Sequence, residues 1–553
     1  MTQVEESTMS DTDLRRHVGL VGLLFASVGS IIGSGWLFGA LTASQIAGPA
    51  AILSWAIGMV MILLIAIVFA ELGTMFPVSG GVVRFPHIAF GSFASFTSGW
   101  ILWIACGTVA PIEVEGALQY ATKYADFTTA HTVGNQPVYT LTTLGYITAV
   151  IMMAVFVMIN YIGVRWFAKV NNVIVWWKLL IITVVIIAFL LTQFHTSNFS
   201  AYGFMPTGWS GVFTAIATSG IVFSFLGFRQ GVELAGETSN PKKYVPITVI
   251  GSVVLTGIIY IGLQVAFLGA VQPSDLAHSD GWAKLDFANS FGPLAAIATV
   301  LGLGWLATLL YVDAIVSPAD TGLIYTTVTS RVSYAMGRNR NAPAALGRTT
   351  SRGVPLVSLI VTFFVGLIVF LPFPSWQQLV GFITSATVLS FGAGPLVVAS
   401  LRRSLPDADR PFRVPGGDAI PLLAFASSNL IVVWAGWTVN WKLFVTVLIG
   451  LVLLAIFEMT RDTPPLELKS GATWMLPWLG GLALLSYLSQ VDASVTRTSV
   501  PLTFWPSALV TIVFSVVIYY VAVSVRLGEE QIREHIEHVE EEANRGHTAE
   551  PAN

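Results

Sequence analysis

The sequence predicts an all-α membrane protein with about fourteen transmembrane helices, and three observations lead to this fold class. Hydrophobic residues make up 54% of the 553 positions, charged residues only 10%, and the mean hydropathy is +0.75, whereas a soluble domain carries about 25% charged residues. Runs of roughly 20 apolar residues, the length that crosses a bilayer, recur along the chain. Two of these runs are broken by glycine at corresponding places, which predicts an inverted repeat of five plus five helices.

The expected spans form two sets of five and one set of four. Span 1 would run outward and span 6 inward, so the two sets of five have opposite topology. The last four spans contain no comparable polar interruption, which favours a scaffold or an oligomer contact. In order, the spans are 18–43, 49–75, 91–121, 141–162 and 170–193; 212–235, 245–271, 295–328, 354–371 and 376–400; and 419–438, 442–459, 474–490 and 503–525.

The basic residues orient these spans. Most of the 27 lysine and arginine residues fall in segments that are cytoplasmic when the N-terminus is inside. An even number of spans then places both termini in the cytoplasm of a plasma (cell) membrane protein. The first apolar run is long enough to span, so we expect it to be retained. The expected parts are a polar segment 1–17, a ten-span core 18–400, a basic loop 401–418, four further spans 419–525 and a charged tail 526–553.

The tail is rich in glutamate and is expected to form a solvated helix that frays. His535 and His538 lie one turn apart there, a spacing that a solvated helix face explains better than a metal site. The single cysteine, Cys106, lies inside an apolar span, so neither a disulfide framework nor a cysteine metal site is available.

The glycine-broken parts of spans 1 and 6 are the candidate binding site. Where a helix unwinds in a membrane, released N–H groups can bind a carboxylate and released carbonyls an ammonium group. The alternative is that small residues only allow close helix packing. Three phenylalanines of span 6 are candidates for an aromatic gate over the ligand. The candidate substrate-binding residues are Ile32, Gly33, Ser34, Gly35, Phe223, Phe225, Leu226, Gly227, Phe228 and Arg229.

Five short segments carry a family likeness. They are GSIIGSGWLF at 29–38, AELGTMFPVSGG at 70–81, ETSNPKKYVP at 237–246, RVSYAMGRNRNAP at 331–343 and DRPFRVP at 409–415. In this order they resemble the amino acid–polyamine–organocation (APC) family, the amino acid permeases with a LeuT-type fold. The likeness covers the first ten spans. It implies transport of an amino acid, although the family usually has an acidic or neutral residue where this chain has Arg229.

Lys178 is a candidate proton-coupling residue. It lies about 14 Å along span 5 from the cytoplasmic end, at a rise of about 1.5 Å per residue, which is too deep for easy contact with water. A desolvated amine can load and release a proton. The family resemblance implies that a lysine here occupies the place where sodium sits in sodium-coupled relatives. The alternative is a permanently charged lysine tied to backbone carbonyls.

Asp313 and Ser317 are the other proton-coupling candidates. They lie four residues apart on span 8 and therefore on one helix face. The resemblance implies that the face of span 8 near span 1 completes the ion site. Asp313 is then either the partner of Lys178 or a second proton carrier, unless it only forms a structural hydrogen bond. Asp320 is expected nearer the inner end, in contact with water.

Four further charged residues have more than one interpretation. Glu113 and Glu115 on span 3 are about 200° apart around the helix, so only one can face a common pocket; each is a possible vestibule or gate residue. Glu71 is expected to serve in packing and gating rather than as a ligand. Arg229 either receives the side-chain carboxylate of aspartate or glutamate, or pairs internally with Glu233, Glu113 or Glu115.

These patterns predict a secondary active transporter, in the first instance a proton-coupled symporter that imports an amino acid. An amino acid exchanger (antiporter) is the alternative, and a non-transporting amino acid sensor is less favoured because no sizeable soluble domain could carry a signal. No nucleophile–base cluster or metal-ligand set is visible, so an enzyme is not expected. The expected partners are an amino acid, protons and the lipid bilayer. No cofactor or nucleic acid is expected, and the sequence does not predict the oligomeric state.

Overall fold

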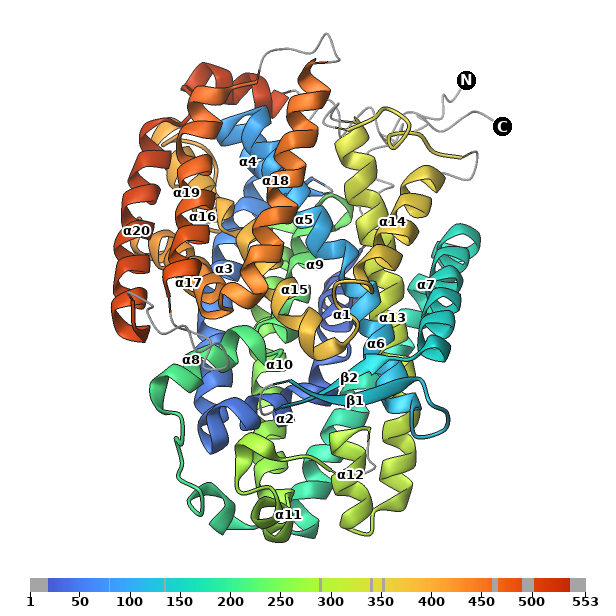
Figure 1. Cartoon of the computed structure of the whole chain (residues 1–553). Helices are drawn as coiled ribbons and strands as arrows, with labels where there is room; N and C mark the ends of the chain where they lie inside the picture. The colour runs from blue at the N-terminus through green and yellow to red at the C-terminus, as the bar shows by residue number, and fades with distance from the viewer. Residues whose placement is uncertain are drawn as a thin grey trace, which may run out of the picture.

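The computed structural model describes residues 18–78, 80–133, 136–287, 291–338, 342–350, 354–459, 466–489 and 502–537. The expected N-terminal segment 1–17 and His538 lie outside the described residues. Within them the protein is a bundle of helices with one two-stranded hairpin, as Figure 1 shows. This confirms the expected all-α membrane fold, because the hairpin joins two helices and forms no larger sheet.

Each of the first five expected spans corresponds to helix. Span 1 is formed by α1 and α2, span 2 by α3, and span 3 by α5 and α6. Spans 4 and 5 are both parts of α7, and a short helix, α4, precedes span 3. The bounds are α1 (Leu20–Ile31), α2 (Gly35–Ala47), α3 (Ala51–Met75), α4 (Gly81–Phe90), α5 (Ser92–Gly107), α6 (Val109–Ala121) and α7 (Thr143–Thr192).

The second five expected spans also correspond to helix. Span 6 is α8 followed by the 3₁₀ helix η4 and by α9, span 7 is α10, span 8 is α13, span 9 is α14, and span 10 is α15 with α16. The bounds are α8 (Gly208–Thr218), η4 (Phe223–Arg229), α9 (Gln230–Glu233), α10 (Pro241–Ala270), α13 (Gly304–Arg338), α14 (Leu356–Val369), α15 (Trp376–Phe391) and α16 (Ala393–Ser404).

The four additional spans form one flank of the molecule. They are α17 (Ala419–Trp434), α18 (Trp437–Met459), α19 (Leu468–Leu488) and α20 (Phe504–Ser524). In Figure 1 this orange-to-red group lies opposite α7, and it contacts the core through α3, α5, α15 and α16. Of the described helices, nine are long and apolar enough to cross a membrane, or ten if the bent pair in span 6 counts as one. The count of fourteen and the part boundaries stay predictions.

α7 is a single 50-residue helical segment that contains two expected spans. At about 1.5 Å per residue it would be about 75 Å long, more than twice the hydrocarbon thickness. Its two ends nevertheless lie on the same side. Leu141, just before α7, donates to the carbonyl of Pro374, and His195, just after it, donates to that of Gly269. The Tyr139 hydroxyl, on the strand before α7, donates to Asp286, which follows α10. The chain therefore reverses direction within α7.

The segments on that side of the molecule were not predicted. The hairpin of β1 (Thr128–Val133) and β2 (Gln136–Leu141) joins span 3 to span 4. The helices α11 (Pro273–His278), η6 (Trp282–Lys284) and α12 (Pro293–Val300) lie between spans 7 and 8. The expected span 295–328 therefore began too early, because apolar α12 was merged with the true span α13.

Both predicted breaks are present. α1 ends at Ile31 and α2 begins at Gly35, so residues 32–34 are unwound. In span 6 the two helical parts are bent by 48°. The breaks contact each other: a Cβ at Gly227 would lie 2.5 Å from the backbone nitrogen of Ile31. Gly227 is therefore required for the two backbones to approach, and both proposed roles of the glycines, unwinding and close packing, are present.

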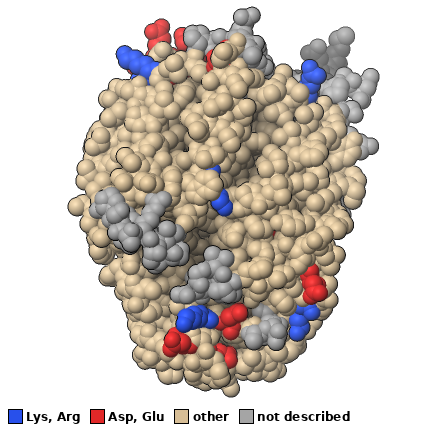
Figure 2. Space-filling model, viewed as in Figure 1, with Lys and Arg blue, Asp and Glu red and all other residues tan. Residues whose placement is uncertain are grey.

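Charge is distributed as a membrane protein requires. On the face drawn in Figure 2, acidic and basic residues gather at the two ends, and the wide belt between them is almost uncharged. Large aliphatic side chains of α7, α18 and α20, among them Leu180, Leu448 and Val513, are exposed. Such a belt is stable in lipid and unfavourable in water.

Two of the sequence motifs meet at one end of the bundle. The buried carboxylate of Glu71, near the end of α3, accepts from Arg402 Nη2 at 2.5 Å and Nε at 3.0 Å. It also accepts from the backbone N–H of Val414 at 2.8 Å, and Arg410 Nε lies 3.6 Å away. The end of span 2 is thereby fixed to the loop after α16, which agrees with the expected packing role of Glu71.

Candidate functional site

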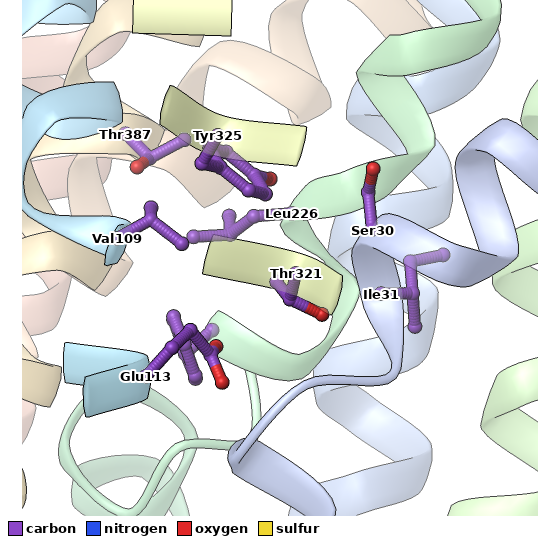
Figure 3. Close-up of a pocket in the computed structure, with 9 residues that line it drawn as sticks. Ser30, Ile31, Val109, Glu113, Leu226, Thr321, Tyr325 and Thr387 are labelled. Atoms are coloured by element: carbon purple, nitrogen blue, oxygen red, sulfur yellow. The ribbon is translucent and has the colours of Figure 1, made fainter. Parts of the chain in front are cut away.

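The two broken spans enclose a small cavity with α6, α13 and α15. Figure 3 shows side chains from these five elements converging on it. Its volume is about 10 Å³, roughly the space for one water molecule. An amino acid would need the cavity to widen. The lining residues are Ser30, Ile31, Val109, Glu113, Phe223, Leu226, Thr321, Tyr325 and Thr387.

Lys178 lies at the carbonyl end of the break in span 1. Its buried ammonium donates to the carbonyl of Gly29 at 2.9 Å and to the Thr321 hydroxyl at 3.1 Å. It forms an ion pair with Asp320 at 2.7 Å, and both side chains are fully buried. The Thr321 hydroxyl also lies 3.2 Å from the carbonyls of Gly29 and Ile32. One cation thus joins span 5, span 8 and the end of α1.

Asp320 corrects one prediction from the sequence. It was expected in contact with water and is instead buried as the carboxylate partner of Lys178. Asp313, seven residues earlier, accepts from Trp177 Nε1 and from the Ser317 hydroxyl, each at 2.7 Å. The four-residue spacing of Asp313 and Ser317 therefore gives a direct contact. Among the described residues, however, the ion pair of Lys178 is with the other aspartate.

Glu113 lies at the amide end of the same break. Its Oε2 accepts from the backbone N–H of Ser34 at 2.6 Å, and its Oε1 has no hydrogen-bond partner among the described residues. The side chain is 1% exposed. A Cβ at Gly33 would lie 2.8 Å from Glu113 Cδ, so the glycine allows the carboxyl group to approach. Trp376 Nε1 donates to the Ser34 hydroxyl at 2.8 Å and ties span 10 to the break.

Glu115 points elsewhere, as the angle around the helix predicted. It is 2% exposed, and neither oxygen has a hydrogen-bond partner in the part of the chain that the structure describes. It does not line the cavity. Only Glu113 of this pair is therefore placed to act on a ligand between spans 1 and 6.

The aromatic residues of span 6 divide into two groups. Phe223 lines the cavity, and its ring meets Trp376 edge to face at 6.4 Å. Phe225 packs on Trp55 and Tyr260, and Phe228 packs on Phe69 and Phe391. Phe225 and Phe228 thus fill space between helices, and of the three candidate gate residues Phe223 lines the cavity. The aromatic gate stays a prediction.

A second cavity, distinct from the inner cavity at the two breaks, lies close to Trp376. It has a volume of about 30 Å³ and is lined by Phe38, Gln119, Tyr139 and Asp286 among others. Phe38 stacks on Trp376 at 4.8 Å, and Trp376 in turn contacts Phe223 of the inner cavity. The rings of Phe38, Trp376 and Phe223 thus form a continuous line of contacts from one cavity to the other.

Arg229 is buried beside the inner cavity. Its guanidinium carbon lies 5.0 Å from the ring centre of Tyr325, which lines the cavity, and its Nη2 donates to Cys106 Sγ at 3.0 Å. Among the described residues, Nε and Nη1 have no hydrogen-bond partner. The expected internal ion pair with Glu233, Glu113 or Glu115 does not occur in the described structure. Within the described residues Arg229 has no carboxylate at ion-pair distance, and Glu233 acts on it electrostatically from farther away.

Several site residues were not selected from the sequence. Thr321, Tyr325 and Thr387 line the cavity, and Trp376 contacts both Phe223 of the lining and Ser34 of the break. The signal for Thr321 was present, since Asp313, Ser317 and Asp320 lie on the same face of span 8 and Thr321 follows directly. Of the ten candidate substrate-binding residues, Phe223 and Leu226 line the cavity, Ser34 binds Glu113, and Gly33, Gly35 and Gly227 permit close approach.

Comparisons with known proteins agree with this arrangement. The family described as amino acid permease matches residues 18–525. The chain is 40% identical to the glutamate/serine transporter AimA of Bacillus subtilis over 481 residues, 86% of this chain and 88% of the relative. It is 34% identical to the aspartate–proton symporter of the same species over 512 residues, 92% and 96% of the two chains. The branched-chain amino acid permease BcaP of this species is 26% identical over 459 residues, 82% and 95% of the two chains.

Proposed function

Because the chain belongs to the amino acid permease family, we propose that it is a proton-coupled symporter that imports an acidic amino acid across the plasma membrane, with both termini in the cytoplasm. The relative with 40% identity is named a glutamate/serine transporter, and the relative with 34% identity is named an aspartate–proton symporter. An exchanger is the second candidate. The fold places the break of span 1 against that of span 6, and this is where the substrate would bind.

The observation that carries the acidic substrate is Arg229. A buried guanidinium stays charged and is costly in a membrane without an anion beside it. Its Nε and Nη1 have no hydrogen-bond partners in the described structure, and its guanidinium contacts the ring of Tyr325, which lines the cavity. A substrate whose α-carboxylate binds near Ser34 would place a side-chain carboxylate toward Tyr325. A rotation of that ring would let Arg229 bind the side chain bidentately.

Lys178 is our proposed proton-coupling residue. Asp313, Ser317 and the ion-pair partner Asp320 belong to the same proposed proton site. The ammonium of Lys178 joins Gly29 of span 1 to Asp320 of span 8. Loss of its proton would remove the ion pair with Asp320 and weaken the hydrogen bond to Gly29, so that span 1 could move against span 8. A proton and a helix movement would thus be linked through one side chain.

Uptake into proteoliposomes tests this function. The wild-type protein should concentrate aspartate or glutamate when an inward proton gradient is imposed, and Arg229→Gln should weaken these substrates far more than alanine or serine. Loss of a charge-assisted pair costs about 1.5–3 kcal/mol, roughly ten- to hundredfold in affinity. Lys242→Gln is the matched control, because it also removes one cation but at an exposed ion pair with Asp409.

The outcomes separate the alternatives. Equal losses across all substrates in Arg229→Gln would refute the role of Arg229 in substrate selection. Uptake that needs an amino acid inside the liposome and ignores the proton gradient would favour the exchanger.

A further inference from the structure

The break in span 1 is held at both of its ends by the protein's own ionisable side chains. Lys178 binds the carbonyl of Gly29 at the end of α1, and Glu113 binds the N–H of Ser34 at the start of α2. Lys178 is a cation that donates to a backbone carbonyl, and Glu113 is a carboxyl group that accepts from a backbone amide. These are the same kinds of contact that the ammonium and carboxylate of an amino acid would make in a broken helix.

Glu113 also occupies the space that a ligand would need. It lines the inner cavity beside Phe223, Leu226 and Thr321. Its Oε2 already accepts the Ser34 N–H at 2.6 Å, so a substrate carboxylate cannot take that donor at the same time. Two carboxylates at one helix start would also repel each other. The second oxygen, Oε1, is buried and has no described hydrogen-bond partner, and the cavity that Glu113 lines has a volume of only about 10 Å³.

We propose that Glu113 is an internal competitor of the substrate carboxylate, and that protonation of Glu113 releases the Ser34 N–H for the substrate. This rests on the proposed function and assigns to that site a second proton-binding group, distinct from Lys178. From the outer solution one proton joins the Glu113 carboxylate, the neutral carboxyl group leaves Ser34, and the substrate carboxylate takes its place. On the inner side the proton leaves to the cytoplasm, and the restored carboxylate displaces the substrate.

Among the described residues, Glu113 is in no ion pair, whereas the charged groups nearest to it are paired with each other. The other ionisable groups that interact electrostatically with it are Lys178 on α7, Tyr260 on α10, and Asp320 and Tyr325 on α13. Lys178 and Asp320 compensate each other in an ion pair. Tyrosine hydroxyls ordinarily stay protonated up to about pH 10.

The sign of the pH effect follows from the competition. Deprotonated Glu113 opposes binding and protonated Glu113 does not, so the apparent substrate affinity must rise as the pH falls. Over the range in which Glu113 is ionised, uptake of one proton per substrate corresponds to about a tenfold change in affinity per pH unit. Between about pH 6 and 8 the carboxyl groups of the substrate are already ionised and do not contribute to this slope.

The experiment measures substrate dissociation constants of the purified full-length protein, with aspartate and glutamate, between about pH 6 and 8. Titration calorimetry in two buffers of different ionisation enthalpy adds the number of protons taken up per substrate. Wild type should show the tenfold-per-unit slope and about one proton. Glu113→Gln should bind at all pH values with a nearly flat slope and take up almost no proton. Glu115→Gln is the matched control, because it removes an equally buried carboxyl two residues away without contact to Ser34; it should keep the wild-type slope.

Each contrary outcome has a distinct meaning. A pH-independent affinity of the wild type would overturn the inference and leave transport intact, and this result needs no variant to fold. A full slope in Glu113→Gln would also overturn it. A folded Glu113→Gln protein that binds at no pH would show that Glu113 is a ligand rather than a competitor. If the wild type binds and transports no amino acid at all, the proposed function fails first.

Discussion

The ion pair of Lys178 and Asp320 allows stability and coupling to be separated in one set of variants. The two groups lie 2.7 Å apart and are fully buried, so removal of either charge leaves the other charge without an ion-pair partner. Breaking a buried pair in this way typically costs about 3–5 kcal/mol. We expect a loss of this size in both Lys178→Met, which keeps most of the side-chain volume, and Asp320→Asn, which keeps the shape.

The double variant should recover most of that loss. With both charges removed, no uncompensated ion stays in the membrane, and replacement of a buried pair by neutral groups is often nearly neutral for stability. The coupling free energy from the double-mutant cycle should therefore be of the same order as a single loss. Unfolding of the purified proteins followed by tryptophan fluorescence measures stability, and proteoliposome uptake under a pH gradient measures coupling. All three variants should lose uphill uptake, including the stable double variant.

Two results would refute this reasoning. If the stability losses of the single variants simply add in the double variant, the two side chains are not energetically coupled. If the double variant still concentrates substrate when only a pH gradient is applied, Lys178 does not couple the proton to transport.

Two further predictions concern the frame around the site. Gly227→Val should fold but lose substrate binding, because its Cβ would lie 2.5 Å from the Ile31 backbone nitrogen and overpacking costs about 1–3 kcal/mol. Gly251→Val is the control, since a Cβ at Gly251 meets nothing within 4 Å. A normal substrate affinity of Gly227→Val would contradict this prediction. Glu71→Gln should speed trypsin cleavage in the loop after α16, since Arg402 and Arg410 lose their shared carboxylate; an unchanged rate would show that the loop is held by other contacts.

The membrane helices could be predicted because the length of each apolar run can be counted in the sequence. Every expected span contains helix, and both breaks coincide with glycine-rich residues between apolar runs. The hairpin β1–β2 and helix α12 could not be predicted in the same way. The hairpin strands are six residues each and weakly apolar. Helix α12 is so apolar that the sequence pattern does not distinguish it from the start of the next span.

The site was predicted in its parts but not in its pairings. Asp313 and Asp320 are seven residues apart and share a helix face, so periodicity alone does not decide which of them meets Lys178. That choice depends on the height of α13 relative to α7. The helix spans Gly304–Arg338 rather than 295–328, which moves Asp320 from the expected inner end to the middle. The contact of Glu113 with Ser34 likewise depends on how two distant spans face each other.

The two side chains that hold the break of span 1 have a consequence for the return of the carrier without cargo. In some carriers the empty binding site would expose backbone amides and carbonyls without hydrogen-bond partners. Closure of such an empty site would bury these groups unpaired, at a large desolvation cost. Here Glu113 covers an amide and Lys178 a carbonyl, so the unloaded protein closes around its own groups. We therefore expect the empty carrier to reset its orientation unaided, which gives one-way accumulation rather than a swap of one amino acid for another.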